Sequence, residues 1–325
     1  MNASIESLPV LVINPYSRCN CRCVMCDIWK GSEINALSRE VIELQFASLA
    51  EMKVRWVVFS GGEPLMHPEI FPLCQAARKM GARVTVLSTG LLINRNAALI
   101  LEYVDDLIVS LDGPEDVHDQ IRRVDGAWRT LASGVERLHS LRPEFPVAGR
   151  CTVQSLNCAS LIDTVHAARD MGLSSLSFLA VDVHSTAFNH VNGLTVLRQS
   201  GLVVSIEQLP VLASQIEMII DQGYSGGFVL ESPVKLRRIM HHFRCHWNMG
   251  NYVAPPCNAP WTAAVVEADG SVRPCFFHPP IGSIRSGDTL VSILNGPPAV
   301  RFRSALDVRS DRICQRCVCS LDWRE

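Results

Sequence analysis

Four cysteines crowd one short segment of this 325-residue chain, and three of them have the spacing of a metal-binding loop. Residues 19–26 read CNCRCVMC, which contains a C-x3-C-x2-C set formed by Cys19, Cys23 and Cys26. Three thiolates on one loop can hold three irons of a cubane [4Fe-4S] cluster and leave the fourth iron open, as a catalytic metal requires. A zinc site is the alternative, although zinc needs a fourth ligand and usually has paired C-x2-C knuckles.

Composition and charge limit the kind of protein that carries this loop. Hydrophobic residues make up 48% and charged residues 19%, which indicates a globular protein. The formal net charge of −2 provides no broad positive field of the kind that binding to nucleic acid or to an anionic membrane would require. No apolar run reaches the roughly 18 residues of a spanning helix, so we expect a cytoplasmic protein. In a reducing compartment, clustered members of the 13 cysteines are expected to be metal ligands or reactive thiols rather than disulfides.

Apolar β-branched runs alternate with segments of helical periodicity along the first 180 residues. The predicted strands are 9–13, 55–59, 83–87, 106–111, 147–153 and 176–180, and the predicted helices are 38–52, 68–80, 95–103, 127–141 and 161–171. This alternation predicts an α/β fold with a parallel sheet, either open or closed into a barrel. In such folds the chemistry gathers at the carboxyl ends of the strands, and the cysteine loop follows the first of them.

The cysteine loop and the segment 61–64, which reads GGEP at the end of the second predicted strand, together resemble the radical S-adenosylmethionine (SAM) superfamily. The resemblance covers about residues 8–182 and implies a partial (βα)6 TIM-like barrel. In that family the three loop cysteines hold a [4Fe-4S] cluster, and the amino and carboxylate groups of SAM chelate its open iron. The resemblance therefore implies reductive cleavage of SAM to a 5'-deoxyadenosyl radical, which abstracts a hydrogen atom from a substrate.

The same resemblance implies where SAM binds. Two glycines let the backbone approach a ligand closely, and the carboxylate of Glu63 can offset a cation, which suits the amino group of SAM. Other contacts are carried over by position to the ends of the fourth and fifth strands. The SAM-binding residues so implied are Gly61, Gly62, Glu63, Pro64, Ser110, Thr152 and Gln154. The segment 88–90 reads STG where the family more usually has TNG, and its role stays open.

A second cysteine set lies in the last quarter of the chain. Its spacing, Cys257-x12-Gly270-x4-Cys275 closed by Cys314-x2-Cys317, resembles the twitch domain, the shorter relative of the SPASM domain attached to many radical SAM enzymes. Four thiolates satisfy all four irons of a second, auxiliary [4Fe-4S] cluster, which leaves no open site for substrate and suits electron transfer. A zinc site, or a redox-silent cluster that stabilises the fold, is the alternative.

Five further residues are candidates for catalysis or substrate binding. Cys245 and Cys319 flank the second cysteine set, and a positioned thiol can give a hydrogen atom to a substrate radical. Packing, or ligation of the cluster, is the commoner role for such a cysteine. Lys30, Arg150 and His184 lie near predicted strand ends or the cysteine loop. We interpret these three as substrate contacts, with Arg150 or His184 as candidate proton acceptors.

These assignments predict a radical SAM core over residues 1–206, a helical linker over 207–247 and a twitch-like cluster domain over 248–325. We expect an oxidoreductase or lyase of natural-product biosynthesis that acts on a small polar substrate such as a sugar, an aminocyclitol or a nucleoside. The auxiliary cluster would assist an oxidation, either dehydrogenation or radical decarboxylation. The expected protein partner is an electron donor such as flavodoxin or ferredoxin.

Three other functions remain as alternatives. One is a peptide-modifying radical SAM maturase, which the short segment before Cys19 disfavours because it cannot form a leader-peptide recognition domain. Another is a redox-neutral epimerase that uses a cysteine as hydrogen donor. The third is an electron-transfer or cluster-scaffold protein without a substrate of its own, and the segment 61–64 argues against it.

Overall fold

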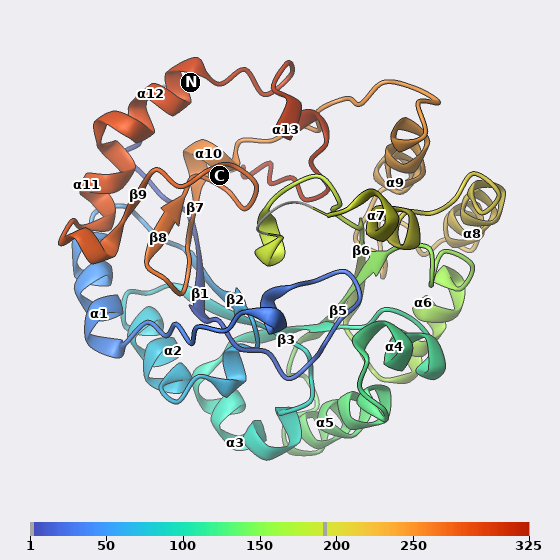
Figure 1. Cartoon of the computed structure of the whole chain (residues 1–325). Helices are drawn as coiled ribbons and strands as arrows, with labels where there is room; N and C mark the ends of the chain where they lie inside the picture. Colours follow the sequence, from blue (N-terminus) through green and yellow to red (C-terminus); the bar gives the residue numbers. More distant parts are fainter. Residues whose placement is uncertain (1–2, 191–193, 325) are drawn as a thin grey trace.

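The computed structural model of this chain describes residues 3–190 and 194–324, and its centre is a curved sheet surrounded by helices (Figure 1). The strand order is β6-β5-β4-β3-β2-β1-β7-β8-β9. Strands β1 to β6 stand in sequence order and pair in parallel. Because β6 and β9 do not pair, the sheet is a partial barrel, which confirms the predicted α/β fold class.

The elements have the following bounds. The strands are β1 Val10–Tyr16, β2 Trp56–Gly61, β3 Arg83–Ser88, β4 Asp106–Ser110, β5 Val147–Val153, β6 Ser175–Ala180, β7 Ala263–Val266, β8 Ser271–Arg273 and β9 Gly282–Ser283. The α-helices are α1 Arg39–Ser48, α2 Ile70–Lys79, α3 Ile93–Tyr103, α4 Glu115–Arg122, α5 Ala127–Leu141, α6 Leu161–Asp170, α7 Val196–Leu202, α8 Leu209–Asp221, α9 Pro233–His246, α10 Ala259–Thr262, α11 Leu290–Asn295, α12 Pro297–Ala305 and α13 Arg312–Gln315. Short 3-10 helices cover η1 Ile28–Lys30, η2 Pro64–Met66, η3 Ala187–Asn189 and η4 Ile284–Ser286. All six predicted strands and all five predicted helices of the first 180 residues are present, and α4 is an additional helix.

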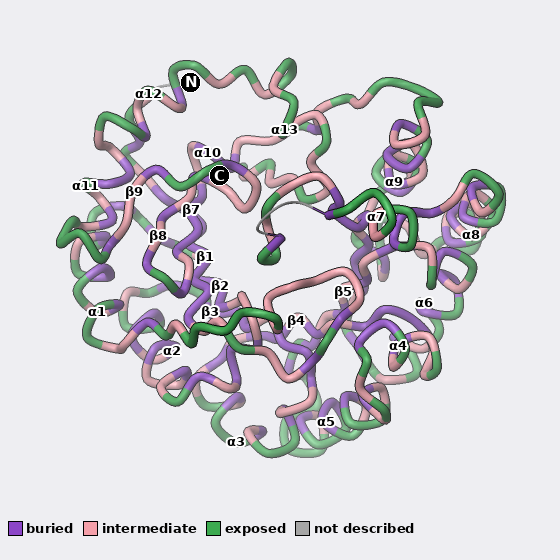
Figure 2. The backbone as a smooth tube through the Cα atoms, in the orientation of Figure 1, coloured by how far each residue is buried: buried purple, intermediate pink, exposed green. Residues whose placement is uncertain are grey.

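The two faces of the barrel strands have different surroundings. On β5, buried residues alternate with half-buried ones, so that Val147, Cys151 and Val153 join the core that the outer helices cover. Figure 2 shows the strands largely as buried backbone and exposed segments on the outer helices. Arg150, on the opposite face of the same strand, lines cavities inside the barrel. Arg150 is therefore a cationic side chain on the inner face of the barrel.

The C-terminal region continues the barrel sheet. Strand β7 pairs in parallel with β1, from Val10 opposite Ala263 to Ile13 opposite Val266, and β7 and β8 form an antiparallel hairpin. The side chains of Cys257 and Cys275 pack against the small apolar cluster that this pairing creates. The pairing thus fixes the second cysteine set against the barrel. Within the part of the chain that the structure describes, no helix is both long enough and apolar enough to cross a bilayer.

Candidate active site

The cysteine loop follows β1 and lies across the mouth of the barrel, at the carboxyl ends of the strands (Figure 1). Two backbone hydrogen bonds tie it to the end of α4. The amide of Arg22 donates to the carbonyl of Arg122 at 3.1 Å, and the amide of Val24 donates to the carbonyl of Ile121 at 3.0 Å. Helix α4, which the apolar pattern did not predict, therefore positions the loop.

Hydrogen bonds among the loop thiols distinguish Cys21 from its neighbours. The hydrogen bond with Cys21 lowers the pKa of Cys19, and the same kind of bond, aided by the charge of Arg122, lowers the pKa of Cys23 to about 6. The hydrogen bond with Cys19 raises the pKa of Cys21 instead. Burial raises the pKa of Cys26 to about 12, so a metal must displace its proton. Cys19 and Cys23 are therefore the loop thiols that lose their protons most easily, and iron binds the thiolate form.

A buried ion pair links the loop to the strand ends. Arg122 and Asp112 are 2.6 Å apart, with side chains 9% and 0% exposed, and Arg122 Nη1 also donates to Cys23 Sγ at 3.6 Å. Asp112 Oδ1 in turn accepts from the backbone amide of Thr152 at 2.9 Å. The pair therefore connects the loop with the ends of β4 and β5. Asp112 directly follows the predicted strand 106–111, whereas no sequence pattern indicated Arg122, which is on the unpredicted helix.

Glu63 uses its carboxylate to join two strand ends. The side chain is fully buried and accepts hydrogen bonds from the Leu65 amide at 3.0 Å, the Ser88 hydroxyl at 2.9 Å, and the Thr89 amide and hydroxyl at 2.6 and 2.7 Å. Burial raises the pKa of Glu63, and these hydrogen bonds oppose the rise. The side chain therefore holds the segment 61–64 against the end of β3. This contact gives Ser88 and Thr89, whose segment had no assigned role, a structural function.

The backbone at Gly61 and Gly62 packs too closely for side chains. A Cβ on Gly61, whose φ is +97°, would lie 2.8 Å from the Cβ of Asn14, and one on Gly62 would lie 2.0 Å from the carbonyl oxygen of Arg18. We expect Gly62→Ala to displace the cysteine loop and to lose the first cluster, which is a loss of about four irons per chain in anaerobic iron analysis. Gly201→Ala, where a Cβ would have no neighbour within 4 Å, should keep its iron. Equal iron contents in the two variants would contradict this packing argument.

Orphaned polar atoms at the barrel mouth fit a ligand such as SAM. Gln154 is fully buried, its Nε2 donates to Met25 Sδ at 3.7 Å, and its Oε1 has no hydrogen-bond partner among the described residues. Asn14 Oδ1 is orphaned in the same way, within the described part of the chain, and Asn14 lines a cavity of about 660 Å³ together with Gly61 and Gly62. Buried acceptors of this kind normally have partners. They are therefore suited to donors from a bound ligand.

The second cysteine set lines one cavity of about 230 Å³ inside the barrel. Four of the lining thiols belong to the predicted auxiliary set, Cys319 is a fifth, and all five are free. Burial raises the pKa of Cys275, Cys314 and Cys317, so iron must displace their protons. A sulfur-rich donor set of this kind fits an iron-sulfur cluster.

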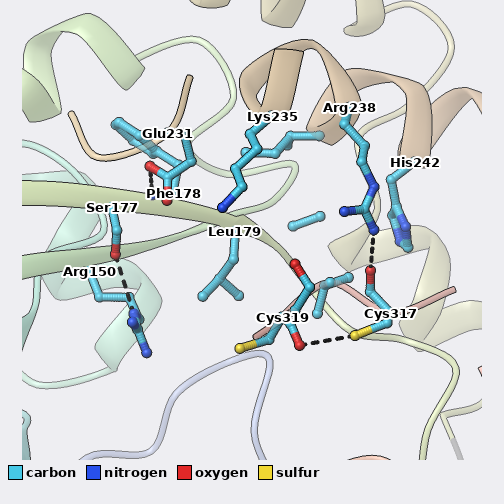
Figure 3. Close-up of a pocket in the computed structure, with 14 residues that line it drawn as sticks. Arg150, Ser177, Phe178, Leu179, Glu231, Lys235, Arg238, His242, Cys317 and Cys319 are labelled. Atoms are coloured by element: carbon cyan, nitrogen blue, oxygen red, sulfur yellow. Dashed lines mark hydrogen bonds between the residues drawn. The ribbon is translucent and has the colours of Figure 1, made fainter. Parts of the chain in front are cut away.

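The second cavity inside the barrel, of about 140 Å³, adjoins these thiols (Figure 3). Arg150 Nε donates to Ser177 Oγ at 3.3 Å, and Arg238 Nη2, from α9, donates to the carbonyl of Cys317 at 2.8 Å. Glu231 also lines the cavity and accepts from the backbone amide of Phe178 at 2.9 Å. The lining further includes Lys235, His242 and Cys319. The cavity therefore brings cationic and acidic groups next to the auxiliary thiols.

Comparison with known families assigns both cysteine sets. Residues 13–154 match the radical SAM superfamily, and residues 257–318 match SPASM, an iron-sulfur cluster-binding domain. The chain carries a radical SAM domain. The SPASM domain follows it, which confirms the suspected family. Because the radical SAM domain binds SAM and a [4Fe-4S] cluster and the SPASM domain binds further iron-sulfur clusters, the predicted cofactors are confirmed as well.

Relatives of the radical SAM domain act in different pathways. Fe-coproporphyrin III synthase of Methanosarcina barkeri is 35% identical over 47% of this chain and 39% of its own length. The antilisterial bacteriocin subtilosin biosynthesis protein AlbA of Bacillus subtilis is 25% identical over 93% of this chain and 63% of its own. This chain thus spans less than two thirds of either relative. The structure of Streptococcus suis SuiB bound to the precursor peptide SuiA superposes with a TM-score of 0.69, at 13% identity, over 97% of this chain and 72% of SuiB, which shows a shared fold.

The structure places the remaining candidates for catalysis and substrate binding in different cavities. Arg150 and Cys319 line the inner cavities beside the auxiliary thiols. Lys30 pairs with Asp27 at 2.8 Å and lines the cavity at the barrel mouth. His184 lines a different cavity, where its Nε2 lies 3.1 Å from the Tyr252 hydroxyl and burial lowers its pKa to about 4.

Cys245 lines that same separate cavity, and its Sγ lies 3.3 Å from His241 Nε2. Neither His184 nor Cys245 is on the lining of the two inner cavities. Ser110 is the last residue of β4, and Thr152 is the last residue but one of β5, as expected. Pro64 begins η2. The predicted SAM residues thus lie at the carboxyl ends of the strands. The substrate candidates divide between four cavities, which are the two inner cavities, the cavity at the barrel mouth and the separate cavity of His184 and Cys245.

Proposed function

We propose that this chain is a radical SAM oxidoreductase that oxidises a small polar substrate inside the barrel, with SAM and an electron donor such as flavodoxin or ferredoxin as co-reactants. The observation that supports the proposal most directly is that Arg150 lines both inner cavities together with Cys317 and Cys319. A substrate that contacts Arg150 would therefore lie beside the auxiliary site. When bound, SAM with the first cluster supplies hydrogen-atom abstraction, and the auxiliary cluster supplies a one-electron acceptor.

In this proposal the chain orients the substrate and accepts its proton. Arg150 and Lys235 offer donors to substrate oxygens. Among the described residues that line this cavity, Glu231 is the only carboxylate. Burial raises the pKa of Glu231, against the opposing effect of the Arg150 and Lys235 charges. A raised pKa makes a carboxylate a better base near neutral pH. Oxidation of an alcohol to a carbonyl releases a hydrogen atom, a proton and an electron. Glu231 would accept the proton, and SAM and the auxiliary cluster, when bound, would supply the acceptors for the hydrogen atom and the electron.

Replacement of Glu231 is expected to change the pH profile of substrate oxidation. Glu231 accepts a proton only when ionised, so the wild-type rate should fall as pH falls through its raised pKa, which lies above the ordinary value of 4.5. Glu231→Gln should lower kcat about 100-fold and remove this acid limb. Glu217→Gln, an exposed carboxylate paired with Arg237, should keep both the rate and the limb. An unchanged acid limb in Glu231→Gln would exclude it as the base.

The double variant Cys314→Ala/Cys317→Ala tests the proposed role of the auxiliary cluster. We expect the folded variant to hold about four irons instead of about eight, to cleave SAM, and to form no oxidised product. The first cluster remains because its three cysteines lie on another loop. Normal substrate oxidation by a variant that has lost these irons would refute the electron-acceptor role.

A peptide is the second candidate substrate, because AlbA, named for bacteriocin biosynthesis, matches 93% of this chain. A deuterium-labelled extract of the source organism distinguishes the two substrate classes. The extract is divided by size into a small-molecule fraction and a peptide fraction, and each fraction is incubated with the protein and SAM. Deuterium in 5'-deoxyadenosine from the small-molecule fraction alone supports the first proposal. Deuterium transfer from the peptide fraction alone supports a maturase.

A further inference from the structure

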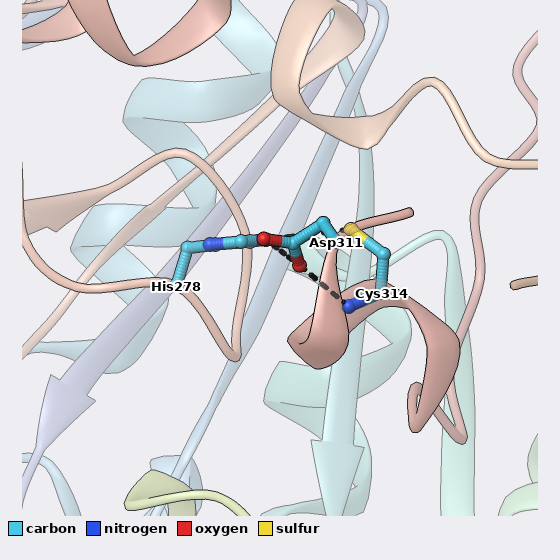
Figure 4. A group of neighbouring side chains, drawn as sticks. All are labelled: His278, Asp311 and Cys314. Carbon is cyan, nitrogen blue, oxygen red and sulfur yellow. Dashed lines mark hydrogen bonds and ion pairs between the residues drawn. The ribbon is translucent and has the colours of Figure 1, made fainter. Parts of the chain in front are cut away.

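His278, Asp311 and Cys314 form a compact group at the auxiliary site (Figure 4). Their potential ligand atoms all lie within 4.8 Å of one another. His278 Nε2 is 3.4 Å from Cys314 Sγ and 3.6 Å from Asp311 Oδ1. Sequence reasoning chose Cys314 alone, since neither His278 nor Asp311 belongs to the cysteine spacing.

The surroundings of His278 hold its ring in this position. The residue is 4% exposed, and its ring packs edge-on against Phe302 with centroids 4.9 Å apart. The His278 carbonyl also accepts a hydrogen bond from Arg273 Nη1 at 3.1 Å, which ties its backbone to β8. The imidazole nitrogen is therefore a fixed neighbour of the Cys314 sulfur.

Cluster binding determines the direction of this contact. A cysteine that binds iron is a thiolate without a proton, so the imidazole must donate for the contact to persist as a hydrogen bond. Asp311 favours the same tautomer, with the proton on Nε2, because its Oδ1 faces this nitrogen. The same oxygen accepts a hydrogen bond from the backbone amide of Cys314 at 2.8 Å. Both neighbours of Nε2 are then acceptors, and the nitrogen carries the proton between them.

We infer that His278 donates an N–H···S hydrogen bond to the Cys314 thiolate and thereby raises the reduction potential of the auxiliary cluster. A hydrogen bond to a cluster sulfur stabilises the additional negative charge of the reduced state. His278 is thus a positioning residue that makes electron acceptance more favourable. The inference rests on the proposed electron-acceptor role for its purpose, but the potential itself can be measured without any substrate.

The test is a redox titration of the auxiliary cluster, followed by electron paramagnetic resonance, in the full-length chain with Cys19, Cys23 and Cys26 replaced by alanine. In this background the auxiliary cluster is the only expected signal. His278→Phe and the smaller His278→Leu both remove the donor, whereas His278→Gln keeps an N–H group. We expect both apolar variants to lower the midpoint potential and the Gln variant to recover most of the difference. A tenfold change in the one-electron equilibrium corresponds to about 59 mV.

Two results would overturn the inference. One is a midpoint potential equal to that of the parent chain in His278→Phe or His278→Leu, measured in the variant that retains its cluster. The other is a stoichiometric single metal ion, such as zinc, that metal analysis finds in the parent chain and not in the His278 variants, with the cluster unchanged. That result would make the three side chains a separate metal site. Neither result depends on SAM cleavage or substrate oxidation, so failure here is distinguishable from failure of the proposed function.

Discussion

Replacing Cys23 with alanine is expected to reduce the formation of 5'-deoxyadenosine from SAM, with dithionite as reductant, to the level of a protein-free control. The radical SAM domain needs three thiolates to hold its cluster and keep one iron open. Cys23 is the loop thiol that the Arg122 guanidinium contacts, and its pKa is lowered to about 6. Its loss removes the ligand that is best prepared to bind iron at neutral pH.

Cys21→Ala is the matched control within the same loop. Its thiol is buried and lies outside the C-x3-C-x2-C spacing of Cys19, Cys23 and Cys26, so it should stay outside the cluster. We expect this variant to cleave SAM at a rate close to that of the wild type. SAM cleavage by Cys23→Ala, or complete inactivity of Cys21→Ala, would show that the ligand assignment is wrong.

Replacing Arg122 with alanine is expected to lower the free energy of unfolding by about 3–5 kcal/mol, as measured by urea titration. The substitution leaves the carboxylate of Asp112, which is 0% exposed on its side chain, without a charged partner. It also removes the guanidinium that contacts Cys23. The cysteine loop should therefore lose affinity for its cluster in addition to the loss of stability.

An exposed ion pair between α4 and α5 provides the control. Arg129 and Glu115 are 2.6 Å apart, but their side chains are 76% and 36% exposed, so solvent screens the pair. Arg129→Ala should cost less than about 1 kcal/mol. If Arg122→Ala costs no more than Arg129→Ala, the buried pair does not anchor the loop.

The barrel strands could be predicted because both of their faces are covered. Strand β3, for example, has Val84, Thr85 and Val86 fully buried in succession, which gives an apolar run with no polar interruption except one small hydroxyl. Helix α4 could not be predicted in the same way. Its sequence EDVHDQIR buries His118 and Arg122 beside Ile121, so polar residues occupy positions where a periodicity argument requires apolar ones.

The cluster cysteines were also predictable, because their spacing is local in the sequence. The groups that support them were not, because they meet only when distant strands come together. Glu63 contacts Thr89 across 26 positions, and Arg122 contacts Cys23 across 99. His278 reaches Cys314 across 36 positions and has no motif of its own. Such contacts depend on the strand order, which a single sequence does not specify residue by residue.

The measurement that tests the account most directly is anaerobic iron and sulfide analysis, with electron paramagnetic resonance of the reduced protein. It compares the wild type with the triple variant in which Cys19, Cys23 and Cys26 are alanine. We predict about eight irons in the wild type and about four in the variant, as two independent [4Fe-4S] clusters require. About four irons in the wild type and none in the variant would contradict the account, because the second cysteine set would then hold no cluster.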